Sequence, residues 1–203
     1  MNKYWTFGIG ALIGLALALG AGWYALNSAY TYHGVVIDPP APAFDITLTD
    51  QHGQPYRLSE QQGKLVLIFF GYTHCPDVCP VTLSEYRQIK RMLGEQAKNV
   101  QFVYITVDPQ RDTPERIGQY LQNFDPEFVG LSGSAEALAA VWKAYGVYQQ
   151  PKESNSAGGY LVDHSSRTYL IDAQGHWRMN YNYGTDSENI AKDLLHLIKN
   201  NDG

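Results

Sequence analysis

The chain has 203 residues, of which 44% are hydrophobic and 17% charged, and this length and composition predict one globular domain with appendages. The formal net charge of −5, without any cluster of Lys and Arg, argues against a nucleic-acid-binding protein. Two cysteines are too few for a fold held together by disulfides, so we expect this pair to be reactive or metal-binding.

Residues 1–26 are expected to form a membrane anchor. Residues 5–26 carry no charged side chain, and a run of this length can cross a bilayer as a helix. Aromatic residues stand at both ends of the run, and Lys3 precedes it, so the N-terminus is predicted to lie in the cytoplasm. The protein would then be a single-pass protein of the cytoplasmic (inner) membrane, with its domain on the periplasmic side. A cleaved signal peptide is the less favoured alternative, because its apolar region is normally shorter.

Residues 27–43 are expected to be a tether. They end in Asp-Pro-Pro-Ala-Pro-Ala, and proline lacks a backbone donor and favours an extended backbone. The globular domain is therefore predicted to cover residues 44–203.

Within the domain, apolar runs alternate with helical patterns. Strands are expected at residues 44–49, 56–58, 65–70, 100–107, 128–131, 147–149, 169–172 and 177–181. Helices are expected at residues 81–93, 114–124, 134–145 and 187–199. This order predicts an α/β domain with a central mixed sheet flanked by helices.

The two cysteines lie in the stretch Gly71–Pro80, between a predicted buried strand and a predicted helix. Cys75 and Cys79 are four residues apart, and a compact turn into a helix can bring both sulfurs to one side. A helix N-terminus stabilises thiolate, which is both the nucleophilic and the metal-binding form of cysteine. Two buried and inert cysteines are the simpler alternative, which the position in a turn behind a strand disfavours.

His164 is the candidate third ligand. It follows a Gly-, Ser- and Asn-rich segment, residues 153–159, which is expected to be a loop that can fold over the cysteines. Two thiolates and one imidazole suit Cu(I), whereas structural zinc requires a fourth ligand, and none is obvious. Taken alone, a single histidine before a strand is more often a surface residue. His74 is expected to point away from Cys75. The remaining histidines are expected at the surface: His33, His52, His176 and His196.

The stretch Asp108–Pro114 follows a predicted buried strand and opens a predicted helix. Asp112 and Thr113 can cap this helix, and Arg111 can pair with a carboxylate. A functional role, shaping the floor beside the cysteines, is the alternative, because the preceding strand should neighbour the strand that leads to them. Asp77 is expected to accept a backbone hydrogen bond in the turn, with tuning of the thiolates as the alternative.

In three separated stretches the chain resembles the Sco/SenC family of thioredoxin-fold copper proteins. These stretches are Cys75–Pro80, Asp108–Pro114 and Asp163–Ser165. A Cys-x-x-x-Cys pattern alone would be weak, whereas the three stretches together and in this order are specific. The resemblance extends from Phe44 to Lys199, with a similar N-terminal anchor.

The resemblance implies a thioredoxin-like domain that binds one copper ion through Cys75, Cys79 and His164. It implies delivery of copper, or of reducing equivalents, to the CuA site of cytochrome c oxidase subunit II during assembly. Periplasmic copper donors are the implied source of the metal.

Two alternative functions use the same cysteines. A membrane-anchored thiol-disulfide oxidoreductase is the stronger alternative, because Cys75 and Cys79 are within reach of a disulfide with modest backbone adjustment. The protein would then be an enzyme as well as a metal-binding chaperone. A thiol peroxidase is disfavoured, because it requires one peroxidatic thiolate with dedicated neighbours and these thiols are paired.

Overall fold

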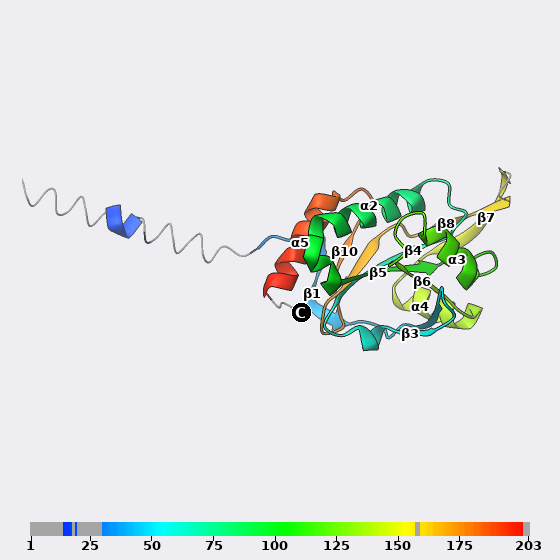
Figure 1. Ribbon diagram of the computed structural model, residues 1–203, viewed down its shortest axis with the longest axis horizontal. Coiled ribbons are helices and arrows are strands. Elements are labelled where there is room, and N and C mark those ends of the chain that lie inside the picture. The colour runs from blue at the N-terminus through cyan, green and yellow to red at the C-terminus, as the bar shows by residue number, and fades with distance from the viewer. Residues whose placement is uncertain (1–13, 18, 20–29, 157–158, 201–203) are drawn as a thin grey trace, which may run out of the picture. The chain divides into compact units, whose positions relative to one another are not determined.

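The computed structural model describes residues 14–17, 19, 30–156 and 159–200 (Figure 1). They belong to two compact units, and the larger unit, the folded domain, begins at His33. Most of the predicted membrane anchor lies outside the described residues. In the parts of the chain that are described, no helix is both long and apolar enough to cross a membrane.

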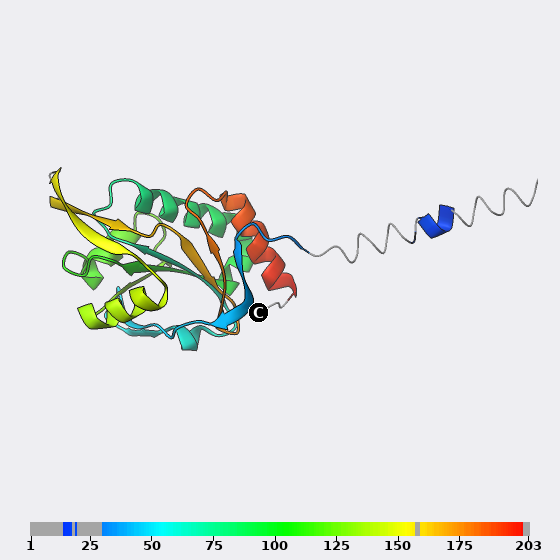
Figure 2. The same cartoon turned by 180° about the vertical axis from the view of Figure 1, so that it is seen from behind.

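Eight of the described strands form one mixed sheet, in the order β1-β10-β9-β4-β5-β6-β2-β3. They are β1 (Val35–Pro42), β2 (Thr47–Asp50), β3 (Pro55–Arg57), β4 (Leu65–Gly71), β5 (Val100–Thr106), β6 (Val129–Ser132), β9 (Thr168–Ile171) and β10 (His176–Tyr181). The helices are α2 (Val78–Leu93), α3 (Pro114–Leu121), α4 (Ala135–Ala144) and α5 (Ser187–Asn200), with 3₁₀ turns η1 (Leu58–Gln61) and η2 (Gly94–Asn99). Helices α2 and α5 lie together on one face of the sheet and α4 lies on the other (Figures 1 and 2). The expected α/β architecture is therefore confirmed.

Strand β4 lies at the centre of the fold. All seven of its residues are buried, as its continuous apolar run predicts for a strand covered on both faces. It pairs with β5 in parallel, from Leu65 opposite Val100 to Gly71 opposite Thr106. Because the two strands end level with each other, the loops that follow them begin side by side at one edge of the sheet. One of these loops carries Cys75 and leads into α2, which carries Cys79, and the other contains Asp108.

The segment expected to be a tether contributes an edge strand instead. Strand β1 pairs antiparallel with β10, from Val35 opposite Asn180 to Pro42 opposite His176, with an irregularity between Val36 and Ala41. Proline cannot donate to a ladder, but an edge strand pairs on one side only and therefore tolerates it. The domain thus begins at His33 and not at Phe44.

The segment expected to be a loop before His164 is also a pair of strands. Strands β7 (Gln149–Ser156) and β8 (Gly159–His164) form a separate antiparallel hairpin, which projects from one end of the domain (Figure 1). Gln149 pairs with His164 at the base of this hairpin. The sequence does not predict these strands, because a hairpin that projects into solvent lacks the alternation of apolar and polar residues found in a strand that covers a core.

His33 is exposed, as expected, but it also makes hydrogen bonds to a buried carboxylate. Its main-chain nitrogen donates to Oδ2 of Asp193 at 2.9 Å, and its Nδ1 lies 2.8 Å from Oδ1 of the same carboxylate. Asp193 lies on α5, is fully buried, and also accepts the hydroxyl of Tyr181 at 3.2 Å. This carboxylate therefore joins the start of the domain to α5 and β10.

Replacing Asp193 by alanine should destabilise the domain by about 2 kcal/mol, because the buried hydroxyl of Tyr181 and the two nitrogens of His33 would lose their carboxylate acceptor. Urea unfolding measures the change. Glu188→Ala serves as the control on the same helix, because this exposed residue makes only a surface ion pair with Lys192. Equal changes in the two variants would contradict the assigned role of Asp193.

Candidate metal centre

Three side chains from separate segments converge at the edge of the sheet where β4 and β5 end. Cys75 lies in the loop after β4, Cys79 in the first turn of α2, and His164 at the end of β8. One ligand atom from each residue lies within 4.8 Å of the other two. Among the described residues, this is the only cluster of three such groups, and His74 is outside it.

The geometry of the cluster leaves one imidazole nitrogen available to a metal. The Sγ atom of Cys79 lies 3.6 Å from Nε2 of His164. On the other side of the ring, Nδ1 of His164 lies 3.0 Å from the carbonyl oxygen of Ser165. Because a carbonyl can only accept, Nδ1 carries the proton, and in the neutral ring Nε2 presents its lone pair to the sulfurs.

The two thiols are not equivalent. Hydrogen bonding from the Cys79 thiol, with further bonds from main-chain N–H groups, lowers the pKa of Cys75 to about 4 against the effect of burial. Burial raises the pKa of Cys79 well above its ordinary value, and the neighbouring charge of Cys75 raises it further. At neutral pH the half-buried Cys75 is thus a thiolate, whereas Cys79 must lose a proton before it can bind a metal.

The first turn of α2 stabilises thiolate at Cys75, as expected, because the main-chain N–H of Cys79 donates to the Cys75 sulfur at 3.4 Å and helps to lower its pKa. It does not do so at Cys79, which is fully buried, so that desolvation raises its pKa. Asp77 stands at the N-cap position of α2 and makes no side-chain capping bond, so the hydrogen bond expected for its carboxylate is absent.

Aromatic side chains and one glycine enclose the buried side of the cluster. The rings of Tyr72 and Phe69 meet the His164 imidazole edge to face, with centroids 5.7 and 6.1 Å away. A Cβ atom at Gly71 would lie 2.9 Å from the Sγ atom of Cys79 and equally close to the rings of Phe69 and Tyr104. The Cys79 sulfur therefore occupies space that only a glycine at the end of β4 leaves open.

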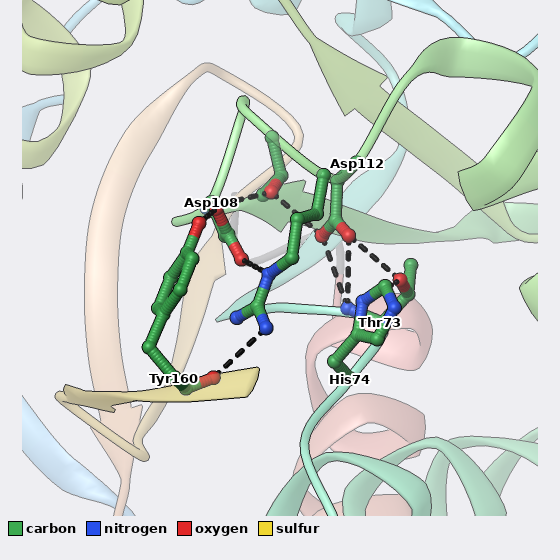
Figure 3. A network of polar contacts seen from close by, with 7 residues as sticks. Thr73, His74, Asp108, Asp112 and Tyr160 are labelled. Carbon is green, nitrogen blue, oxygen red and sulfur yellow. Dashed lines mark hydrogen bonds and ion pairs between the residues drawn. The ribbon is translucent and has the colours of Figure 1, made fainter. Parts of the chain in front are cut away.

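The loop between β5 and α3 reaches the cysteine turn through Asp112 (Figure 3). Thr113 caps α3, as expected, with its hydroxyl accepting from the main-chain nitrogen of Arg116, whereas Asp112, which could also have capped the helix, does not. The Asp112 carboxylate turns instead to Thr73, two residues before Cys75, and accepts its hydroxyl at 2.7 Å. The stretch therefore has both roles that were considered for it, because Thr113 caps the helix while Asp112 contacts the cysteine turn.

The same loop also contacts the hairpin that carries His164. The expected ion pair of Arg111 is present, with Nε 2.5 Å from Oδ2 of Asp108. Arg111 Nη1 also donates to the carbonyl oxygen of Tyr160 at 2.8 Å, and its guanidinium lies 3.6 Å from the centre of the Tyr160 ring. Tyr160 lies on β8, so this contact fixes the strand that ends at His164.

Comparison with known proteins identifies the family. A model of the family described as SCO1/SenC matches residues 40–199. The chain belongs to the SCO1/SenC family. A "SCO2-like protein" of Rickettsia felis is 35% identical over 158 residues, which are 77% of this chain and 75% of that protein.

Two Sco structures with copper bound have a similar fold. The Bradyrhizobium japonicum ScoI structure with copper bound is 40% identical, with a TM-score of 0.71, and covers 77% of this chain and 99% of that one. The yeast Sco1 structure with copper bound is 30% identical, with a TM-score of 0.71, and covers 79% of this chain and 90% of that one. The thioredoxin-like Sco fold expected from the sequence is therefore confirmed.

The sequence identified the three clustered residues of this Sco protein but missed the residues that hold them. Gly71, Thr73 and Tyr160 have no reactive group that would mark them as part of a site. Gly71 opens the stretch Gly71–Pro80, and a glycine at the end of a buried strand is a sequence signal for close packing. No sequence signal connects Tyr160 to Arg111, because their contact depends on a hairpin that the sequence did not predict.

Cys75 should react with iodoacetamide down to acidic pH, because its lowered pKa keeps it a thiolate until the pH falls through about 4. The pH dependence of the alkylation rate in the reduced, metal-free protein measures this. Cys79→Ala removes the hydrogen bond that lowers the pKa of Cys75 most, so the rate should then fall off at higher pH. Cys79→Ser retains a hydrogen-bond donor, so the pH at which the alkylation rate falls should lie between those of the wild type and of Cys79→Ala. A Cys75 that titrates near 9 in all three proteins would contradict the assignment.

Replacing Gly71 by alanine should destabilise the protein by about 1–3 kcal/mol, because the new Cβ overlaps the Cys79 sulfur and two rings. It should also accelerate alkylation of Cys79 by displacing the sulfur from its buried position. Gly118→Ala in α3 is the control, because a Cβ there meets Gln51 at an ordinary 3.4 Å. Thermal unfolding and alkylation rates compare the variants, and similar losses in both would contradict a specific role of Gly71.

Proposed function

We propose that this protein binds one copper ion through Cys75, Cys79 and His164 and delivers it to the CuA site of cytochrome c oxidase subunit II during assembly. The observation that carries the proposal is the convergence of two sulfurs and one imidazole nitrogen within 4.8 Å. Membership of a family that includes copper-bound structures supports the same metal. The CuA destination rests on the family resemblance alone.

The donor set favours copper over zinc. Thiolates are soft ligands that select Cu(I), and imidazole also suits copper. Structural zinc takes four protein ligands, and among the described residues the cluster contains only three. A three-ligand site also suits a protein that must release its metal, because a receiving site can approach the copper on its open side.

The unequal thiols suggest an order of events for loading. The half-buried Cys75 is already a thiolate and can capture copper without losing a proton. Cys79 then releases its proton as the metal arrives, and the fixed tautomer of His164 presents Nε2 to the same ion. Release to a partner reverses this order, with Cys79 regaining a proton.

We also propose that residues 1–26 anchor the protein in the cytoplasmic membrane, with the copper site on the periplasmic side. Because the folded domain begins at His33, only residues 27–32 separate it from the proposed anchor. Six extended residues span about 20 Å at most. The domain would therefore act close to the membrane surface, where a membrane-bound oxidase subunit and periplasmic copper donors can reach it.

A second function, thiol-disulfide exchange, uses the same residues. A nucleophilic thiolate beside a neutral thiol is the arrangement that disulfide reductases require. Cys75 would attack a substrate disulfide, and Cys79 would then release the substrate by forming the Cys75–Cys79 disulfide. The two functions exclude each other at any moment, because a disulfide consumes the thiolates that bind copper.

His164→Ala should abolish or strongly weaken binding of one copper per chain, because it removes the only nitrogen ligand while both thiols remain. Metal analysis after dialysis against a competing chelator measures the loss. His52→Ala replaces an exposed histidine in the β2–β3 turn and should retain the metal.

The same variant separates the two functions. Reduction of a disulfide substrate that survives His164→Ala, in a protein that no longer binds copper, would favour the exchange function. Unchanged copper affinity in His164→Ala would remove this residue from the proposed site.

A further inference from the structure

The loop between β5 and α3 holds both segments that carry the candidate ligands (Figure 3). On one side, Asp112 binds the turn that precedes Cys75. On the other side, Asp108 and Arg111 bind β8, the strand that ends at His164. One short loop thus bridges the thiol segment and the imidazole segment, which are far apart in the sequence.

The hydrogen bonds of Asp112 identify it as a buried carboxylate. Oδ1 accepts the hydroxyl of Thr73 at 2.7 Å, and Oδ2 accepts the main-chain N–H of Thr73 at 3.0 Å and the hydroxyl of Thr106 at 2.8 Å. The Thr106 hydroxyl accepts the N–H of Asp108, so its own proton is directed at Asp112. Every one of these partners donates, and both oxygens accept, which is the pattern of an ionised group. Arg111 directs its guanidinium to Asp108 instead.

The negative charge of Asp112 acts on the nearby sulfurs. Both of its oxygens accept hydrogen bonds from Thr73, two residues before Cys75, which places the charge beside the turn that carries the thiols. A buried negative charge raises the free energy of any further negative charge placed near it, such as a second thiolate. It favours states in which the sulfurs carry less negative charge, or in which a bound metal carries more positive charge. It therefore favours the disulfide over the dithiol, and Cu(II) over Cu(I).

The strand that ends at His164 is held by hydrogen bonds and an ion pair as short as those around Asp112. The hydroxyl of Tyr160 donates to Oδ1 of Asp108 at 2.6 Å, while Oδ2 of the same carboxylate pairs with Arg111. The guanidinium stacks on the Tyr160 ring and donates to its carbonyl oxygen. Tyr160 precedes His164 by four residues in the same strand, so a loss of these contacts would free the hairpin that carries the imidazole.

We propose that the β5–α3 loop is a positioning device that sets the separation of the two sulfurs from the imidazole, with Asp112 holding the thiol side and Arg111 the imidazole side. The proposal rests on the proposed copper site. Two soft sulfurs can satisfy Cu(I), whereas Cu(II) depends more on the harder imidazole nitrogen. The loop therefore favours Cu(II) and lowers the Cu(II)/Cu(I) midpoint potential.

Potentiometric titration of the full-length, copper-loaded protein tests the proposal. Asp112→Asn removes the charge, and Arg111→Lys removes the stacking and the bond to Tyr160. Each should change the ratio of Cu(II) to Cu(I) affinity about tenfold in favour of Cu(I), which raises the midpoint potential by about 59 mV for one electron. Thr113→Ala is the matched control in the same loop, because it removes the N-cap of α3 without touching either segment. It should lower the melting temperature and leave the midpoint potential unchanged.

A metal-free measurement tests the Asp112 half separately. Reduction of the Cys75–Cys79 disulfide by two molecules of glutathione gives the dithiol and one molecule of oxidised glutathione, so that electrons and protons balance. Asp112→Asn should shift this equilibrium about tenfold toward the dithiol, which is about 30 mV for two electrons. Arg111→Lys should leave it unchanged, because that residue acts on the imidazole.

The proposal is overturned if Asp112→Asn and Arg111→Lys lower the melting temperature while the copper midpoint stays at the wild-type value. Should Asp112→Asn fail to fold, Thr73→Val replaces it, because it removes the hydroxyl donor and keeps the charge; it should also raise the copper midpoint. A wild-type protein that binds no copper would refute the proposed function, and the glutathione equilibrium would then still decide whether Asp112 acts on the thiols.

Discussion

The Cys79 sulfur is buried beside Gly71 at the end of β4, where a thiolate is costly. The arrangement of the site follows from this constraint. A buried thiol donates its hydrogen bond to the more exposed sulfur of Cys75, and that bond contributes most to keeping Cys75 ionised. The two cysteines of one short motif therefore differ in pKa because one is fully buried and the other is not.

The asymmetry connects the two functions that the site can support. A thiolate that is ready at neutral pH can capture a soft metal ion or attack a disulfide, and a neutral neighbour can join it in either case after losing a proton. His164 is the residue that distinguishes the outcomes, because it contributes to metal binding and not to exchange. Its position depends on a hairpin that is fixed to the β5–α3 loop by Arg111, so the chemistry of the thiols and the placement of the imidazole meet in that loop.

The sequence predicted the parts of the fold whose pattern reflects burial. The run at 65–70 is buried on every side and became β4, and the cysteines that follow it came together with His164. Other parts depended on contacts that local pattern does not encode. The prolines near residue 40 indicated a tether, but an edge strand needs donors on one side only. The Gly- and Ser-rich segment before His164 indicated a loop, because a hairpin exposed to solvent leaves no apolar alternation. From the sequence, Asp112 could either cap a helix or bind Thr73. It binds Thr73 because β4 and β5 end opposite each other, which brings the two loops together.

The central claim is that copper in this protein has two sulfur ligands and one imidazole nitrogen. X-ray absorption spectroscopy of the copper-loaded, full-length protein measures the ligand atoms directly. The account predicts a first shell of two sulfurs and one nitrogen, with the outer-shell scattering of a single imidazole ring. A first shell of sulfur alone, or one that contains two imidazoles, would contradict it.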